Sequence, residues 1–284
     1  MKVLICSNLK KEKTLEVLPE VVNILTESGM TAAMTESAAE FYNSPCVEYI
    51  SEPLSLSKID VILTVGGDGT ILKWAKKAAL ADKPLIGINT GRLGFMTSLE
   101  PEELRLLSEL KTGNYSVSKR MLMKATILSE KKSVSYLALN DIVFSKDSYS
   151  KLPEFSVCIN GFVVSRLRAD GLILSTPTGS TAYALSAGGP IIEPDAECME
   201  LTPLCAHTLL NRPMIFSGND EISVSYKGYE GSAVNVSVDG DSGIYFGEND
   251  RIVISKSPVA FKLIDINGNS FYNALNNKLL RPLK

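Results

Sequence analysis

The segment VILTVGGDGT, residues 61–70, constrains the fold more than any other part of this chain. Residues 60–65 are nearly all apolar, which is typical of a strand that is buried on both faces of a parallel sheet. A glycine-rich turn over 66–70 follows directly, and a helix is expected over 70–80. In open α/β sheets, ligands bind at the carboxyl ends of such strands.

The residues of this turn favour a phosphate-binding role. Glycines let the backbone approach an oxyanion closely, and a helix N-terminus offers free N–H groups and a positive dipole end. Asp68 is unusual here, because its carboxylate repels phosphate unless a cation or a proton-transfer role compensates. A kinase provides both, since Mg²⁺ accompanies the nucleotide and a carboxylate can accept the proton of an attacking hydroxyl. Lys73, one turn into the helix, is placed to reach a phosphate.

Two alternatives stay open at this point. In a purely structural interpretation, Asp68 only caps the helix. The pattern is neither GxGxxG nor the Gly-Lys-Ser/Thr of a Walker loop.

A second glycine-rich segment, NTGRLGF at 89–95, follows the next buried strand, so that it is expected at the same edge of the sheet. It is also compatible with a plain loop.

The residue pattern divides the chain into two domains. Strand and helix patterns alternate at first, which predicts an α/β domain with a parallel sheet over 1–114. Long alternating or β-branched runs then predict a mostly β domain over 115–267, and the tail 268–284 is compatible with a helix or an extended segment. In the first domain, strands are expected at 3–6, 31–34 and 85–88, a helix around 15–25 that ends at Gly29, and a short helix from Pro101 to Gly113. In the second, strands are expected at 125–128, 135–144, 155–159, 172–175, 222–226, 233–238 and 251–255, with turns at 160–161 and 239–240.

Polar residues interrupt two runs of the second domain. The segment TPTGSTAYALS, 176–186, brings several hydroxyls to the start of a helix that is expected near 180–187. One cap needs one hydroxyl, so we expect others to face a ligand; a Ser/Thr cap with a buried Tyr183 is the simpler alternative. Asn140 and Asp141 stand inside a predicted strand, where adjacent side chains point to opposite faces, so at least one is expected to face a cleft or a partner. A bulge or a structural hydrogen bond is the alternative.

Composition narrows the class of protein. The 284 residues are 45% hydrophobic, enough for a sizeable core, and the formal net charge of −3 comes without the basic stripe of a nucleic-acid binder. The five cysteines form no CxxC pair, which predicts a reduced, cytoplasmic compartment without a disulfide framework. With a single histidine, the sequence shows no zinc cluster. No apolar run approaches the length of a membrane helix, so no membrane partner is expected.

Five motifs taken together carry a family resemblance. GGDGT, NTGRLGF, LND, RADGLILSTPTGSTAYALSAGGP and AHTLLNRP follow one another between residues 61 and 213. In this combination the chain resembles the NAD kinase family, whose members depend on ATP or polyphosphate. GGDGT alone is also found in lipid kinases of the diacylglycerol type and in phosphofructokinases, whereas TPTGSTAY is the specific part.

The resemblance implies a fold, an assembly and a set of site residues. It implies an α/β N-terminal domain that the C-terminal tail rejoins, a β-rich C-terminal domain, and homodimers or homotetramers. Asp68 falls on the family's catalytic aspartate. Asp141 stands where glutamate is commoner, and its side chain is one methylene shorter. The implied nucleotide- and dinucleotide-contacting positions are Gly66, Gly67, Asp68, Gly69, Thr70, Lys73, Phe95, Asn140, Asp141, Lys151, Arg168, Asp170, Thr181, Ala182, Tyr183, Ala184, Leu185, Ser186 and Asp241.

The predicted reaction is phosphoryl transfer. ATP with Mg²⁺ or another divalent cation donates its γ-phosphoryl group to the adenosine ribose 2′-hydroxyl of NAD, with Asp68 as the base, and NADP is the product. A diacylglycerol-type lipid kinase and a non-catalytic dinucleotide sensor are the alternatives. His207 is interpreted as a packing or hydrogen-bonding residue, and Trp74, the single tryptophan, as a core residue.

Overall fold

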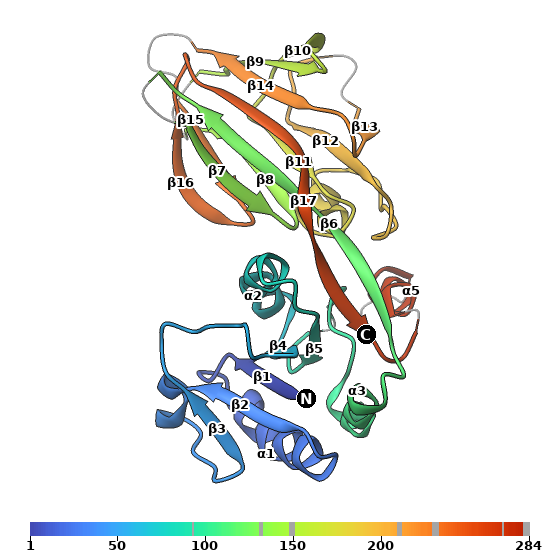
Figure 1. Ribbon diagram of the computed structural model, residues 1–284. Coiled ribbons are helices and arrows are strands. Elements are labelled where there is room, and N and C mark those ends of the chain that lie inside the picture. The colour runs from blue at the N-terminus through green and yellow to red at the C-terminus, as the bar shows by residue number, and fades with distance from the viewer. Residues whose placement is uncertain are drawn as a thin grey trace. The chain divides into compact units, whose positions relative to one another are not determined.

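The chain folds into two compact units (Figure 1). The computed structural model describes residues 1–284 except 93, 131–132, 148–150, 209–211, 229–232, 269 and 281–284. Unit 1 comprises Met1–Lys119 and Phe261–Lys284, and unit 2 comprises Arg120–Ala260. The sequence placed these divisions at 114/115 and 267/268. They differ because two long strands, β6 (Ser116–Leu128) and β17 (Arg251–Asp265), each contribute residues to both units.

Unit 1 is an α/β domain, as predicted. Its parallel strands lie in the order β5-β4-β1-β2-β3, and the end of β17 pairs with β5 through Leu263 and Leu85. The strands are β1 (Lys2–Ser7), β2 (Thr31–Thr35), β3 (Val47–Ile50), β4 (Val61–Gly66) and β5 (Leu85–Asn89). Every residue of β4 and β5 is buried, which explains their unbroken apolar sequences.

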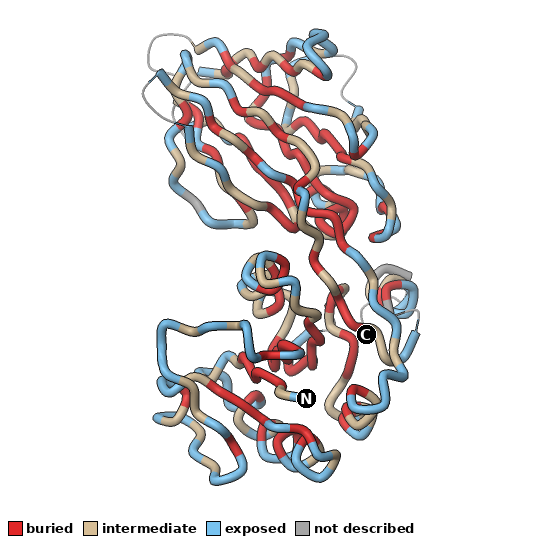
Figure 2. Tube along the Cα trace, in the orientation of Figure 1, coloured by how far each residue is buried: buried red, intermediate tan, exposed pale blue. Residues whose placement is uncertain are grey.

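Two helices follow the predicted patterns. In α1 (Glu12–Glu27), Leu18, Val22 and Leu25 are buried on one face, and Gly29 follows the helix with φ +69°. Helix α2 (Asp68–Leu80) begins directly after the glycine turn. Figure 2 shows that the buried residues concentrate in the strands of each unit and on one face of these helices.

The rest of unit 1 is less regular. The segment 101–112 forms a 3₁₀ helix, η2 (Pro101–Ser108), and one α-turn, α3 (Glu109–Thr112), before Gly113 ends it with φ +77°. Another 3₁₀ turn, η1 (Glu36–Glu40), lies between β2 and β3, whereas the connection 51–60 between β3 and β4, described throughout, contains no helix. The C-terminal segment is helical: α5 (Ser270–Leu275) continues into a π-helical turn, η4 (Asn276–Leu280).

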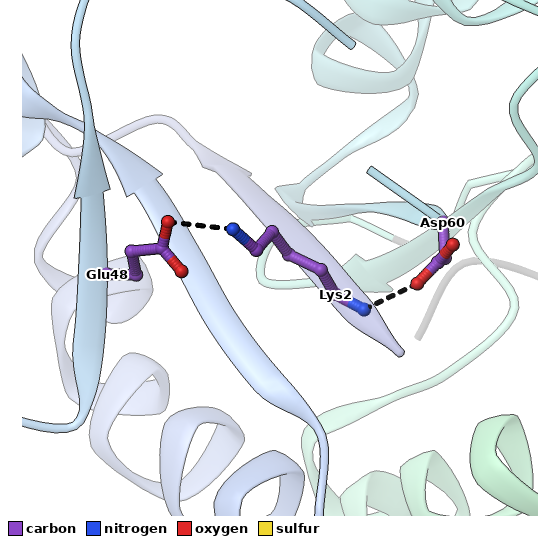
Figure 3. A network of polar contacts seen from close by, with 3 residues as sticks. All are labelled: Lys2, Glu48 and Asp60. Carbon is purple, nitrogen blue, oxygen red and sulfur yellow. Dashed lines mark hydrogen bonds and ion pairs between the residues drawn. The ribbon is translucent and has the colours of Figure 1, made fainter. Parts of the chain in front are cut away.

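Lys2 anchors the start of the parallel sheet (Figure 3). Its Nζ atom lies 2.7 Å from Oε1 of Glu48 on β3, and its backbone N–H donates to Oδ2 of Asp60 at 2.7 Å. One residue of β1 therefore contacts β3, which lies beyond β2 in the sheet, through its side chain, and the residue that precedes β4 by one position through its backbone.

Unit 2 consists of two antiparallel sheets that share one core. The first contains β10 (Phe162–Arg168), β9 (Glu154–Ile159), β14 (Ile222–Lys227) and β17, with β6 pairing β17 and β7 (Ser133–Ala138). The second has the order β13-β12-β11-β8-β15-β16. Phe144, Phe155, Tyr226 and Phe246 meet in the core, with ring centroids 5.6–6.4 Å apart. The strands of the second sheet are β8 (Asp141–Lys146), β11 (Gly171–Ser175), β12 (Cys198–Leu204), β13 (Met214–Ser217), β15 (Val234–Val238) and β16 (Asp241–Phe246).

The prediction of one strand over 135–144 is wrong. The strand ends at Ala138 and a new one, β8, begins at Asp141, so that β7 and β8 belong to different sheets. The hairpin turns are confirmed, because Asn160 and Asp239 have φ of +49° and +53° and the glycines after them have positive φ as well. The helical interruption is confirmed as η3 (Gly179–Thr181) and α4 (Tyr183–Ser186). The strands β10, β12, β13 and β16 were not predicted. No helix among the described residues is long and apolar enough to cross a membrane.

Candidate functional site

The glycine turn fixes the Asp68 carboxylate against the second glycine-rich segment. The N–H of Phe95 donates to Oδ2 at 2.8 Å, and the N–H of Met96 donates to Oδ1 at 3.1 Å. Gly67, rather than Asp68, occupies the N-cap position of α2. The cap interpretation is therefore wrong: Asp68 is the first residue of the helix, and its carboxylate is oriented by a loop from another part of unit 1.

The glycines of the two segments fall into two groups. At Gly94, an added Cβ would lie 2.1 Å from Oδ1 of Asp68, and at Gly66 it would lie 2.2 Å from Oγ1 of Thr70. These two glycines allow close packing. At Gly67 and Gly69, an added Cβ would meet no described heavy atom within 4 Å, so the backbone there is open to a ligand.

A polar cavity of 350 Å³ opens beside this turn at the carboxyl ends of β1 and β4. Exposed Lys11 and Lys73 bring two positive charges to it, and the N-terminus of α2 adds the positive end of a helix dipole. These features together suit an anion such as phosphate. The cavity, which we call the phosphate cavity, is lined by Ser7, Asn8, Lys11, Gly67, Gly69, Thr70, Lys73 and Trp74.

The C-terminal helices contact the same loop. The rings of Phe95 and Phe271 lie 6.1 Å apart, and Nζ of Lys278 lies 4.3 Å from the centroid of the Phe95 ring. These contacts lie within unit 1, which includes the C-terminal segment. Phe95 itself is half-buried.

In unit 2, the carboxylate of Asp239 organises the chain at Asn140. The N–H groups of Leu139, Asn140 and Asp141 donate to its oxygens at 3.0, 2.7 and 3.2 Å. This cradle takes up the N–H groups that a continuous strand would use for pairing, which is why β7 and β8 are separate. Sequence reasoning interpreted Asp239 only as part of a turn, and the Asp-Gly pair gives no signal of this second role.

Asp141 is a buried carboxyl group at the start of β8, with a relative exposure of 6%. Burial, together with the nearby charge of Asp239, raises its pKa from the ordinary 3.8 to about 6. The structure thus keeps an acidic group in a place where its charge is unfavourable, and such groups concentrate at functional sites. The buried Oδ1 atom of Asn140 has no hydrogen-bond partner among the described residues.

The segment 176–186 contacts the backbone of Leu139 and Asn140. The hydroxyl of Thr176 donates to the carbonyl of Leu139, and its N–H donates to the carbonyl of Asn140 at 2.9 Å. An added Cβ on Gly179 would lie 2.1 Å from that carbonyl, so only glycine fits. The polar pair and the hydroxyl segment therefore form one site in unit 2.

The hydroxyl groups of this segment differ in their hydrogen-bond partners. Ser180 donates to the carbonyl of Pro177 at 2.7 Å and accepts the N–H of Ile192 at 3.0 Å, which is a structural role. Thr181 donates to the carbonyl of Thr178 at 3.2 Å. The hydroxyl of Thr178 is buried without a partner among the described residues. Tyr183 is 48% exposed, so the alternative with a buried tyrosine is wrong.

The structure places the other predicted positions as follows. Ala184 is buried, Ala182 and Leu185 are half-buried, and Ser186 is exposed. Arg168 pairs with Glu154 at 3.7 Å, and Asp170 pairs with Lys146 at 3.6 Å. Lys151 and Asp241 are exposed, the latter beside the turn that carries Asp239.

Trp74 differs from its predicted role, because it is half-buried rather than part of the core and lines the phosphate cavity. His207, for which packing or hydrogen bonding was predicted, is exposed, so the packing alternative is wrong. Its backbone N–H donates to the carbonyl of Arg168 at 2.7 Å.

One carboxylate lies at the glycine turn, that of Asp68, and a single carboxylate suits a metal ion that arrives with a nucleotide. Among the described residues, no group of three or more His, Cys, Asp and Glu side chains could hold a metal ion. Mg²⁺ is usually held by one or two carboxylates together with substrate phosphates. Asp68, beside a phosphate cavity, fits that arrangement.

Comparisons with known proteins agree over nearly the whole chain. The family models ATP-NAD kinase N-terminal domain and ATP-NAD kinase C-terminal domain match residues 3–115 and 139–266. A NAD kinase of Natranaerobius thermophilus is 35% identical over 274 residues, which cover 96% of this chain and 95% of that protein. Yeast NADH kinase complexed with NADH is similar in structure, with a TM-score of 0.87, 25% identity, and coverage of 100% of this chain and 90% of that one. An NAD kinase from Archaeoglobus fulgidus in complex with ATP gives a TM-score of 0.70 at 28% identity, with 96% of each chain covered.

Proposed function

This chain belongs to the NAD kinase family, and we propose that it transfers the γ-phosphoryl group of ATP to the 2′-hydroxyl of the adenosine ribose of NAD, giving NADP. The observation that carries the proposal is the Asp68 carboxylate, which two backbone N–H groups hold beside an open glycine turn. A pure binding protein gains nothing from a carboxylate between two residues that line a phosphate site, Gly67 and Gly69. Neither the lipid kinase nor the sensor is supported by the comparisons.

We assign the triphosphate of ATP to the phosphate cavity. The open backbone at Gly67 and Gly69 and the ammonium groups of Lys11 and Lys73 provide donors for its oxygens. These local donors offset the overall negative charge of the protein. Mg²⁺, when bound with ATP, neutralises charge on the phosphates, and Asp68 is the residue that we expect to contact it.

We assign NAD to the residues around Asp141. Asn140, Asp141 and the run 181–186 supply acceptors and small side chains. Arg168 and Asp170 lie toward the other end of β11, where Gly171 pairs with Ser145 while Ser175 pairs with Asp141, so their assignment to NAD rests on the family resemblance alone. The buried acceptor atom of Asn140 supports this assignment, because a buried polar atom without a partner is costly unless a ligand satisfies it. Lys151 and Asp241 are further proposed contacts in unit 2, and Phe95 is a proposed nucleotide contact in unit 1.

In the proposed chemical step, Asp68 orients the 2′-hydroxyl of NAD and takes its proton. The ribose oxygen forms a bond to the γ-phosphorus as the bond to the β–γ bridging oxygen breaks, and ADP leaves with that oxygen. General-base help of this kind contributes roughly 10²- to 10⁴-fold in rate. Positioning and charge neutralisation supply most of the remainder, because phosphoryl transfer needs little covalent chemistry from the protein.

We further propose a Mg²⁺-dependent homodimer or homotetramer of the cytoplasm. The five free cysteines are consistent with a reducing compartment. Size-exclusion chromatography with light scattering gives the oligomeric state directly.

The test is to incubate the purified protein with ATP, Mg²⁺ and NAD and to measure NADP with an NADP-specific dehydrogenase. Formation of NADP and ADP in equal amounts is the expected result. The same assay with a short-chain diacylglycerol tests the lipid kinase. Saturable binding of NAD without any NADP would favour the sensor and overturn the proposal.

A further inference from the structure

A second cavity adjoins the phosphate cavity and shares Trp74 with it. It has a volume of 850 Å³ and runs from Thr35, at the end of β2, and Ser37, in η1, along the flank of α2. The connection 51–60 forms its other wall. We call this cavity the flank groove; its lining residues are Thr35, Ser37, Glu52, Pro53, Leu54, Leu56, Trp74, Lys77, Leu80 and Ala81.

The topology of the sheet explains why the flank groove exists. The connection 51–60 between β3 and β4, which the structure describes throughout, contains no helix, so a loop rather than a helix forms the wall of the groove opposite α2. Trp74 is left half-buried, and Leu80 is 66% exposed. The phosphate cavity lies at the ends of β1 and β4, and the flank groove begins at the end of β2. Because β1 lies between β4 and β2 in the sheet, the two cavities lie next to each other.

The lining of the flank groove matches a nucleoside. The indole of Trp74 and the apolar side chains of Leu54 and Leu56 offer contact to the faces of a base. Polar groups lie close by: Ser37 Oγ is 3.0 Å from Thr35 Oγ1 and 3.4 Å from Glu52 Oε1. Such groups can bind ribose hydroxyls or an exocyclic amine.

Positive charge connects the two cavities. Lys73 lines the phosphate cavity, and Lys77, one helical turn later, lines the flank groove. The Lys77 ammonium lies 5.0 Å from the centroid of the Trp74 ring, and its exposed side chain can swing aside for a base. A molecule with a polyphosphate at one end and an aromatic base at the other therefore fits the pair of cavities better than a polyphosphate alone.

We propose that the flank groove binds the adenosine of the phosphoryl donor, with the adenine stacked on Trp74, and that the donor is therefore a nucleoside triphosphate rather than inorganic polyphosphate. This rests on the proposed function, which places the triphosphate in the phosphate cavity. Glu52 is the acceptor for a ribose hydroxyl or the adenine amine, and Lys77 flanks the α-phosphate.

The binding test uses the chain's single tryptophan as its own reporter. The emission of Trp74 is titrated with Mg-ATP, with NAD and with Mg-tripolyphosphate, each alone, so that no turnover occurs. We expect a saturable change with Mg-ATP that exceeds the change with tripolyphosphate, and none with NAD. A response to NAD but not to ATP would assign the groove to the other adenosine and overturn the proposal.

The kinetic test compares Trp74→Ala with Trp74→Phe and with Phe41→Ala. Phe41 is a matched control, since it is a 52% exposed aromatic residue of unit 1 outside the groove. Loss of one stacking contact is expected to raise the KM for ATP about 10-fold in Trp74→Ala. The KM for NAD and the inhibition constant of tripolyphosphate against ATP should change less than about twofold, because neither depends on stacking at Trp74.

The outcomes separate this inference from the proposed function. Trp74→Phe should restore most of the ATP affinity, and Phe41→Ala should behave as wild type. Equal losses for ATP and tripolyphosphate, or no loss for either, would overturn the adenosine site while NADP formation stands. If the wild-type protein forms no NADP, the proposed function fails, and the emission titration still decides whether ATP binds at Trp74.

Discussion

Replacing Asp141 by Asn tests whether ionisation of the buried Asp141 carboxyl group lowers the stability of the folded protein. Asp141 is buried beside Asp239, and its pKa is raised from 3.8 to about 6. The folded protein therefore holds this proton more tightly than the unfolded chain does, and stability falls as pH rises from about 4 to about 7. Asn is nearly isosteric and never ionises, so Asp141→Asn removes the cost.

The magnitude follows from the size of the shift. One pKa unit corresponds to about 1.4 kcal/mol, so the raised pKa lowers the free energy of unfolding by about 1.5 kcal/mol at pH 5 and about 3 kcal/mol at pH 8, relative to a side chain that never ionises. Asp141→Asn should gain those amounts in free energy of unfolding. The variant should also bind NAD less well, by about 10-fold in KM, because a hydrogen bond to a charged acceptor is stronger than one to a neutral acceptor.

The assay is urea denaturation at several pH values between 5 and 8, followed by far-UV circular dichroism. Tryptophan emission would report on unit 1, where Trp74 lies, rather than on unit 2. Glu248→Gln is a matched control, since Glu248 is an exposed carboxylate of the same unit. A stability difference that stays constant over this range would refute the argument, and so would a variant less stable than wild type at pH 8.

Three further variants test the contacts of the two sites. Asp68→Asn should lower kcat at least about 10²-fold with NAD binding retained, and near-full activity would show that Asp68 is not the base. Gly94→Ala places a methyl group against the Asp68 carboxylate and should lower kcat similarly; Gly91→Ala, whose added Cβ would come no closer than 3.9 Å to a neighbour, should cost far less in the same assay. Asp239→Ala leaves three N–H groups at 139–141 without their acceptor and should lower the free energy of unfolding by at least about 2 kcal/mol, whereas Asp239→Asn, which keeps one acceptor oxygen, should lose less. If urea denaturation gives equal losses of free energy of unfolding for the two Asp239 variants, Asp239 does not act as the acceptor of these N–H groups.

The glycine turn could be predicted because its signals are local. A strand buried on both faces, a pair of glycines and a helix all lie within residues 61–80, and each has its own sequence pattern. The contact between Asp68 and the loop at 95–96 was expected only in outline, since the order of parallel strands brings their carboxyl ends together.

The break at Asn140 could not be predicted because its cause is distant. β-Forming residues stand on both sides of the polar pair Asn140-Asp141 within 135–144, so the local sequence gives no sign that the strand ends there. The acceptor that ends the strand, Asp239, lies 99 residues away from Asn140. The strands of unit 2 that were not predicted lack a clear alternation of apolar and polar residues. Among them, β12 contains Glu200 and Pro203, and β16 contains Gly243.

The composition of unit 1 from two chain segments has a consequence for the order of folding during synthesis. N-terminal domains generally fold first as the chain emerges. Here the pairing of Leu85 with Leu263 and the buried side chain of Ile264 complete the sheet and core of unit 1 only after unit 2 has been made. Until then, residues 98–99 pair with the end of β5 at 87–89, but the edge at Leu85 lacks its partner, and an unpaired edge is a template for association with other chains. The first segment of unit 1 is therefore synthesised before unit 2, and its last segment after unit 2. A chain whose synthesis stops before residue 261 lacks the strand residues that pair with β5 at Leu85.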